Sequence, residues 1–425
     1  MAALDKSIYE EIIITSADGS KTVDIAMGSL TIDYYEDLFS PVTTVRMIVA
    51  NDGYTITGED GNLQSVYNGL PLRGGETVSI KIKGNCESNP GLDFTDRPFF
   101  VSSIENVIVT RKTESFLLNL VSIGSITNET SRVGKKFPTS LKISESVQDI
   151  VKNYLSDERD VDIDPTQNKY GFIGNMRKPF TTLVWLASKS VPEKSEKDST
   201  AGYVFYETKS GYHFRSIDSL IDASPIEKYH YTEVIRSDPK DDYKIIDYRT
   251  CLNEDVLGKL QRGAYCSYRI FFDPLTFTYT DPAKGIFKEE NYKGKSRTLG
   301  KEVNLPGNLG SSPSRYITAV KDIGTLEKKS ENYKDENADP TLSQSQSMMR
   351  YNSIFSQQMV MTIPSNTNLE AGSLIECEFQ LASAEKDGTD TEQSGLYMIK
   401  ELCHHFDNCG SYTSLTLIKD TFGSK

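Results

Sequence analysis

The most restrictive feature of this sequence is a set of alternating apolar and polar residues that begins near residue 369. Two such runs, 396–406 and 412–418, flank a polar turn that contains Gly410. This pattern is typical of a β-hairpin. Gly372 precedes a third alternating run at 374–379. Because alternation with a period of two places the apolar side chains on one face, the three runs predict one antiparallel sheet.

The first 125 residues carry the same signature. Alternation in 77–82 and 115–121 gives each of these runs one apolar face. Turn-forming Asp-Gly pairs follow the strand-like runs, as expected between antiparallel strands. We therefore expect an antiparallel β-barrel of about six to eight strands in 1–125. Its other predicted strands are 8–14, 22–26, 30–34, 43–49 and 99–109.

The periodicity changes after residue 139. In 144–155 apolar residues recur at helical spacing, with Ser144 as the expected N-cap. A second helix is predicted from Phe180 to Val191, and Pro192 is expected to stop it. A hairpin with its turn at 210–211 follows. The sequence therefore predicts a small α+β middle domain.

The rest of the chain returns to β character. Strands are predicted at 245–248 and 265–272, and again from 359 to 417. We expect 240–275 and 350–425 to form one second barrel. The intervening 276–349 would continue the middle domain of 126–239. Its polar stretches 332–340 and 343–347 are expected to form a mobile loop or an interface arm.

Composition narrows the class of protein. A chain of 425 residues is longer than one hydrophobic core usually supports, so about two to four domains are expected. A net charge of −13 disfavours a nucleic-acid binder, which needs a concentrated basic surface. The six cysteines are scattered, which favours reduced thiols over a disulfide framework. No signal-peptide pattern occurs at the start, so synthesis in the cytoplasm is expected.

Three phrases together resemble a known family. They are Leu-x-x-Gly-x-x-Ile at 369–375, Gly-x-Tyr-x-Ile-x-x-x-x-His at 395–404, and Thr-x-Leu-x-Leu-x-x-Asp at 413–420. They resemble the closing sheet of the baseplate central hub subunit of contractile-tailed phages. The N-terminal hub region of type VI secretion spike proteins shares that sheet. The run 171–187 is also similar to hub proteins of myophages related to those that infect cyanobacteria.

The resemblance implies a fold and a role. The fold would be mainly β, or α+β overall, with two tail-tube-like antiparallel barrels and an α+β middle domain. Three copies would form a homotrimeric ring that adapts a six-fold tail tube to a three-fold central spike. The implied partners are the central spike protein and the tail tube or its initiator proteins, with the tape measure and baseplate wedge proteins as further partners. DNA would only pass through. The protein would belong to the virion, at the tail baseplate, after assembly in the host cytoplasm.

The alternative function class is an enzyme. It would be either a metal-dependent hydrolase or a carbohydrate-active tail hydrolase. The candidate ligands for a metal are Cys403, His405 and Cys409, with Cys377 as a further thiol. Their spacing matches no standard zinc pairing, and a histidine in this strand packs in the hub family. We therefore expect no catalytic residue, no metal and no cofactor, and a protein that is not an enzyme.

Overall fold

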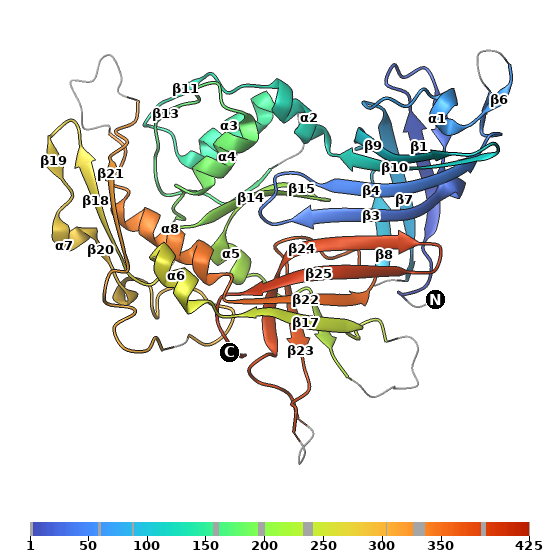
Figure 1. Ribbon diagram of the computed structural model, residues 1–425. Helices are drawn as coiled ribbons and strands as arrows, with labels where there is room; N and C mark the ends of the chain where they lie inside the picture. Colours follow the sequence, from blue (N-terminus) through green and yellow to red (C-terminus); the bar gives the residue numbers. More distant parts are fainter. Residues whose placement is uncertain are drawn as a thin grey trace.

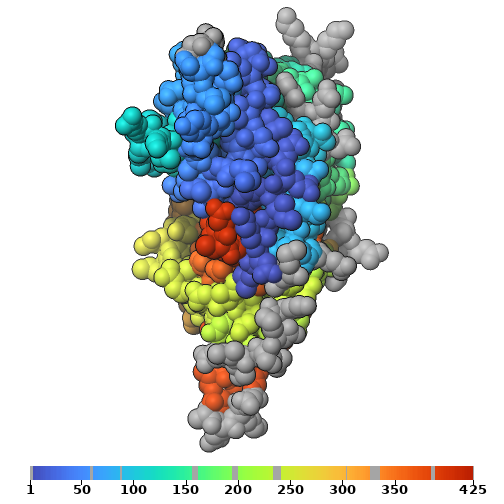
Figure 2. Space-filling model, turned by 90° about the vertical axis from the view of Figure 1, so that its right-hand side faces the viewer, coloured from blue at the N-terminus to red at the C-terminus, as the bar shows by residue number. Residues whose placement is uncertain are grey.

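Most of the chain belongs to one continuous β-structure. The computed structural model describes residues 3–57, 61–86, 89–155, 161–193, 200–232, 241–302, 304–325, 336–383 and 388–424. Within these residues the main path of a 14-stranded sheet runs β17-β22-β25-β24-β3-β4-β10-β9-β7-β1-β2 (Figure 1). The molecule is elongated when viewed from the side (Figure 2). This confirms the prediction of a mainly β fold.

The first β-unit comes from the N-terminal strands, and every strand expected there is present. Burial alternates along it: Val45, Met47 and Val49 face the core, whereas Arg46 and Ile48 are exposed. This alternation gives the unit one core of its own. Its strands are β1 (Ile8–Thr15), β2 (Thr22–Asp24), β3 (Ser29–Asp37), β4 (Thr44–Asp52), β7 (Thr77–Cys86), β8 (Asn89–Asp93), β9 (Phe99–Val109) and β10 (Thr113–Val121), with β5 (Ile56–Thr57), β6 (Leu63–Gln64), η1 (Ala26–Gly28) and α1 (Val66–Gly69) in its connections.

The second β-unit combines strands from two distant parts of the chain. The N–H of His230 donates to the carbonyl of Tyr243 at 3.1 Å, and Ile245 donates back to His230 at 2.8 Å. This exchange joins β16 to the segment that leads into β17, so the ring of strands returns on itself around a second core. The strands are β16 (Glu227–His230), β17 (Asp247–Asn253), β22 (Gln357–Pro364), β23 (Leu374–Glu378), β24 (Gly395–Asp407) and β25 (Ser411–Lys419).

The two β-units are joined by a seam, the antiparallel pairing of β24 with β3. It runs from Glu401 opposite Asp37 to Asp407 opposite Thr31. Phe406 of β24 is fully buried in the core of the first β-unit. The seam therefore joins the two β-units by both backbone hydrogen bonds and apolar packing, through two strands that lie more than 300 residues apart in sequence.

The middle unit packs helices on a small sheet around a core of its own. As predicted, Val147, Ile150, Val151 and Leu155 form the buried face of the first long helix. The elements are α2 (Ile123–Thr130), α3 (Ile143–Tyr154), α4 (Pro179–Ala187), α5 (Ile217–Ile221), β11 (Lys136–Phe137), β12 (Asp162–Ile163), β13 (Phe172–Ile173), β14 (Tyr203–Thr208) and β15 (Gly211–Ser216).

Both predicted helix boundaries are wrong. The N-cap of α3 is Lys142, whose N–H donates to the carboxylate of Glu145 at 2.8 Å. Ser144 lies inside the helix, and its hydroxyl accepts from Thr166. The helix α4 ends at Ala187, well before Pro192, where the backbone changes to i→i−3 hydrogen bonds: Lys189 donates to Leu186 at 3.0 Å and Ser190 to Ala187 at 3.2 Å.

A separate sheet lies at the left of Figure 1, around β18 (Ser267–Asp273). This strand, expected in the second barrel, pairs here with β19 (Thr278–Tyr279), β20 (Ile286–Phe287) and β21 (Arg315–Val320). The short elements α6 (Val256–Arg262), α7 (Pro282–Gly285) and η2 (Glu289–Asn291) accompany it. The domain boundaries themselves stay a prediction.

The polar stretch 343–347 is not a loop. It lies inside α8 (Thr341–Ser353). The hydroxyl of Ser345 donates to the carbonyl of Thr341 at 2.9 Å, and Ser345, Ser347 and Arg350 are buried. Side-chain hydroxyls that bond within the helix make a serine-rich segment compatible with a buried helix face. Of the other stretch, 332–340, residues 332–335 lie outside the described part of the chain.

Candidate functional site

The shared wall is the outward face of β9, β10, β4, β3, β24, β25, β22 and β17. Figure 1 shows most of these strands stacked from β10 at the top to β17 at the bottom. Along β24, Leu402, His404 and Phe406 are buried, so the residues between them point outward. The alternation continues through the seam into β3, where Ile32, Tyr34 and Glu36 are buried.

Carboxylates dominate the shared wall. Asp33 of β3 stands opposite Arg46 of β4 and opposite His405 of β24. The cations at outward positions of these strands are Arg46, Arg249 and Lys400, whereas Lys419 of β25 is buried. The acidic side chains at outward positions are Asp33, Asp37, Asp52, Glu105, Asp247, Glu401 and Asp407. The wall therefore carries a net negative charge.

The structure brings together two of the three candidate metal ligands. Nδ1 of His405 lies 2.5 Å from a carboxylate oxygen of Asp33, and Nε2 lies 3.2 Å from one of Asp407. The thiol of Cys403 lies 4.0 Å from the same Asp33 oxygen. Cys409, in contrast, is exposed in the hairpin turn.

Cys377 lies in the core of the second β-unit, where burial raises the pKa of its thiol. Among the described residues, no group of three or more His, Cys, Asp or Glu side chains is placed to hold a metal ion. That the protein binds no metal stays a prediction.

His404 points to the opposite face from His405, because successive side chains of a strand alternate. It is fully buried, its ring stacks on Tyr34 at 6.1 Å, and Nδ1 lies 3.0 Å from the Thr413 hydroxyl. Burial lowers the pKa of His404 to about 3, so the imidazole is neutral. This histidine is a packing residue of the seam.

Glu36 marks the point where both β-units meet the middle unit. It is buried, and it accepts the hydroxyl of Tyr34 at 2.8 Å, the N–H of Lys209 at 2.7 Å and the N–H of Ala371 at 2.8 Å. Burial, followed by the nearby charge of Glu370, raises the pKa of Glu36 to about 7. No sequence pattern predicts this buried site, because an acidic residue in an alternating strand is expected to face solvent.

Glu36 predicts how stability changes with pH. The carboxyl has its ordinary pKa of 4.5 in the unfolded chain and a pKa of about 7 in the folded one, so unfolding releases a proton between these pH values. The contribution of Glu36 is therefore present below pH 4.5 and is lost as pH rises through 7, on the order of 3 kcal/mol. Urea unfolding at several pH values should show a flatter profile for Glu36→Gln than for the wild type. The half-exposed Glu10→Gln should follow the wild-type profile, and an identical profile for Glu36→Gln would contradict the prediction.

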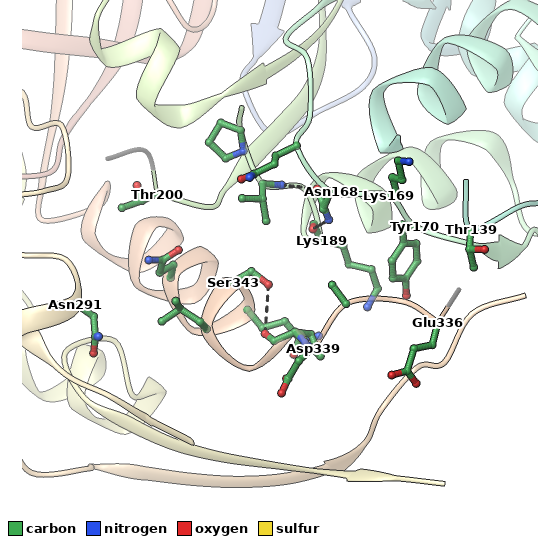
Figure 3. A pocket seen from close by; sticks show the side chains of 18 of the residues that line it. Thr139, Asn168, Lys169, Tyr170, Lys189, Thr200, Asn291, Glu336, Asp339 and Ser343 are labelled. Carbon is green, nitrogen blue, oxygen red and sulfur yellow. Dashed lines mark hydrogen bonds between the residues drawn. The ribbon is translucent and has the colours of Figure 1, made fainter. Parts of the chain in front are cut away.

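A cavity of about 1020 Å³ lies between the middle unit and the start of α8. Figure 3 shows Tyr170 and Lys189 on one side and Asp339 and Ser343 on the other. Asn168 holds the wall in place: its amide donates to the carbonyl of Lys189 at 2.9 Å and its oxygen accepts the N–H of Val191 at 3.0 Å.

Several polar side chains that line this cavity interact with neighbouring residues of the chain. The amine of Lys189 lies 5.2 Å from the ring of Tyr170, and burial lowers the pKa of Lys189. The hydroxyl of Ser343 donates to the carbonyl of Pro340, and Asp339 accepts the N–H of Thr341 at 2.9 Å. The described lining residues include neither histidine nor cysteine.

No helix in the described part of the chain has the length and apolar character needed to cross a membrane.

The fold has relatives among solved structures, although no protein-family model and no curated protein matches the sequence. A tail protein from Neisseria meningitidis aligns with 96% of this chain and 96% of its own, with a TM-score of 0.55 at 10% identity. The 43 kDa tail protein of prophage MuSo2 from Shewanella oneidensis aligns with 97% and 98% of the two chains, with a TM-score of 0.52 at 8% identity. The chain has the fold of phage tail proteins along nearly its whole length, as the resemblance to hub subunits implied.

Proposed function

We propose that this protein is a structural baseplate hub of a contractile phage tail. The observation that carries the proposal is the seam, in which β24 of the second β-unit pairs with β3 of the first. One chain thereby presents two similar units side by side in one continuous wall. Three copies would place six such units around an axis, which suits a six-fold tube on one side and a three-fold spike on the other. The fold shared with tail proteins supports this reading.

The shared wall would line the channel. Its outward carboxylates outnumber its cations, and the chain as a whole has 60 acidic and 47 basic residues. Because a lumen rich in Lys and Arg would bind the phosphates of passing DNA, an acidic wall favours passage without retention. DNA is thus cargo in transit, and no specific DNA site is part of the proposal.

The other partners follow from the same role. The hub would contact the central spike, the tail tube or its initiator, and the tape measure and wedge proteins, and it would work without enzymatic activity. It would assemble in the host cytoplasm and act within the virion. Its surfaces for these partners differ from the seam, because the seam is already occupied within each chain.

The experiment is a mass measurement joined to imaging. Light scattering should give three chains per particle for the protein alone or with a spike trimer from the same phage, and negative-stain images should show a ring with a central channel. Duplex DNA titrated onto the ring at physiological salt should bind negligibly. A particle that stays monomeric with the spike present would overturn the hub. Sub-micromolar, salt-sensitive DNA binding would overturn the acidic channel.

A further inference from the structure

The outer edge of β24 is divided between two partners. Residues 395–398 pair with β23 of the same β-unit. An irregularity follows between Ile399 and Glu401, and residues 401–407 then pair with β3 of the other unit. A strand that leaves its own unit halfway along can therefore join a neighbouring one.

The strand β9 repeats this pattern in the first β-unit. Phe99 and Phe100 pair with β7, as the start of β24 pairs with β23. A register shift follows, and from Ser103 to Val109 the strand pairs only with β10 among the described residues. Its other edge is open there. In Figure 2 the teal end of the β9–β10 hairpin stands out from the body of the molecule.

The strand β17 has the position in the second β-unit that β3 has in the first. The order β23-β24-β25-β22-β17 of one unit corresponds to β7-β9-β10-β4-β3 of the other. The strand β3 is covered by β24, but β17 pairs only with β22 among the described residues, and most of its side chains are exposed. The two open edges are thus the equivalents of the two strands that form the seam.

We propose that residues 103–109 of β9 in one copy pair antiparallel with β17 of the next copy, in a second seam that repeats the one within the chain. This proposal rests on the ring proposed above and assigns its interface. Each copy would supply β9 at one end of the shared wall and β17 at the other. This head-to-tail contact closes after three copies if the rotation at the second seam matches that at the first.

The ladders also give the register. Across β25 and β22, Glu401 aligns with Arg249; across β10 and β4, Ser103 aligns with Arg46 and then with Asp33. Arg249 is therefore the equivalent of Asp33, which pairs four residues beyond Glu401. The β9–β10 ladder has a second register shift between Glu105 and Ile108, which β24 lacks, so the residue of β9 that corresponds to His405 is Ile108, and Ile108 would face Arg249.

The side chains fit this register. Val107, Ile108 and Val109 are 38%, 61% and 58% exposed, an apolar row on an open edge that a strand partner would cover. The register shift of β17 between Thr250 and Leu252 would lie opposite that of β9, so the two strands stay aligned and Cys251 would lie opposite Asn106. Asp247, opposite Thr110, would lie near the basic tip at Arg111 and Lys112, within reach of an ion pair. Both apolar contact and charge are complementary.

A disulfide tests the register directly. Residues opposite each other in antiparallel strands have Cα atoms within disulfide range. We expect Asn106→Cys, oxidised in air, to link with native Cys251 and to give covalent dimers and trimers on a non-reducing gel, which a reducing agent abolishes. The double variant Asn106→Cys, Cys251→Ser should lose these bands. Thr318→Cys, on the exposed edge strand β21, should not give them.

A second variant tests the contact without a covalent bond. Val107→Lys places a charge on the open edge, and we expect the mass to fall threefold, from trimer to monomer, with the circular dichroism spectrum unchanged. The matched Val320→Lys, on β21, should remain trimeric. A trimer that survives Val107→Lys and gives no Asn106→Cys bands would overturn this interface and leave the hub standing. A wild-type monomer in the presence of the spike would overturn both.

Discussion

Replacing Phe406 by alanine is expected to lower the free energy of unfolding by about 3–5 kcal/mol, the usual cost of truncating a fully buried phenylalanine. The side chain belongs to β24 but is buried in the core of the first β-unit. Its removal therefore leaves a cavity in one unit and weakens the attachment of the other. Urea unfolding followed by tyrosine fluorescence and circular dichroism measures the loss.

Phe277→Ala is the matched control. This phenylalanine is 79% exposed, so its truncation should change the free energy of unfolding by no more than about 0.5 kcal/mol. Equal effects of the two variants would mean that Phe406 does not contribute to a shared core.

Replacing Arg350 by methionine is expected to cost about 3–5 kcal/mol, because it leaves buried carboxylates without their cation. The guanidinium of Arg350, on α8, lies 2.9 Å from Asp218 and 3.4 Å from Asp420, and all three side chains are at most 4% exposed. These residues tie α8 and the last strand to the middle unit. A shift of the urea midpoint reports the loss.

Two comparisons separate lost charge pairing from lost packing. Lys81→Met removes an exposed cation beside Glu10 and Asp93, and it should cost less than about 1 kcal/mol. The double variant Arg350→Met, Asp218→Asn should recover part of the loss, because it removes one of the uncompensated charges. If the double variant is less stable than Arg350→Met, the charge argument is wrong.

Local patterns were enough to predict the strands. The alternation in 396–406 and 412–418 became β24 and β25 within a residue or two of the predicted bounds. The same holds for β9, predicted at 99–109 and found there. In β24 and β25 one face is mostly buried and the other is solvated, which gives their sequences a period of two; in β9 only the start alternates, and its second half is exposed.

The contacts between units were beyond the sequence. The pairing of β24 with β3 depends on which edges meet, and no local pattern encodes that choice. Glu36 and Arg350 are charged residues that tertiary partners allow to be buried. The serine-rich stretch in α8 reads as a loop, because its buried face is polar rather than apolar. Alternation also places Cys403 and His405 on the same face of β24, but no local pattern indicates that Asp33 of β3 is their shared neighbour.

The seam also constrains the order of events on the ribosome. Asp37 and Glu401 pair with each other, and at 5–20 residues per second their synthesis is separated by roughly 20–70 s. During that interval the edge of β3 that β24 later covers is unpaired, and the core of the first β-unit lacks Phe406. A chain that terminates early would keep this edge open and be prone to aggregation. The paired wall forms only after β24 has been synthesised, so the late synthesis of this strand restricts assembly into the particle to nearly complete chains.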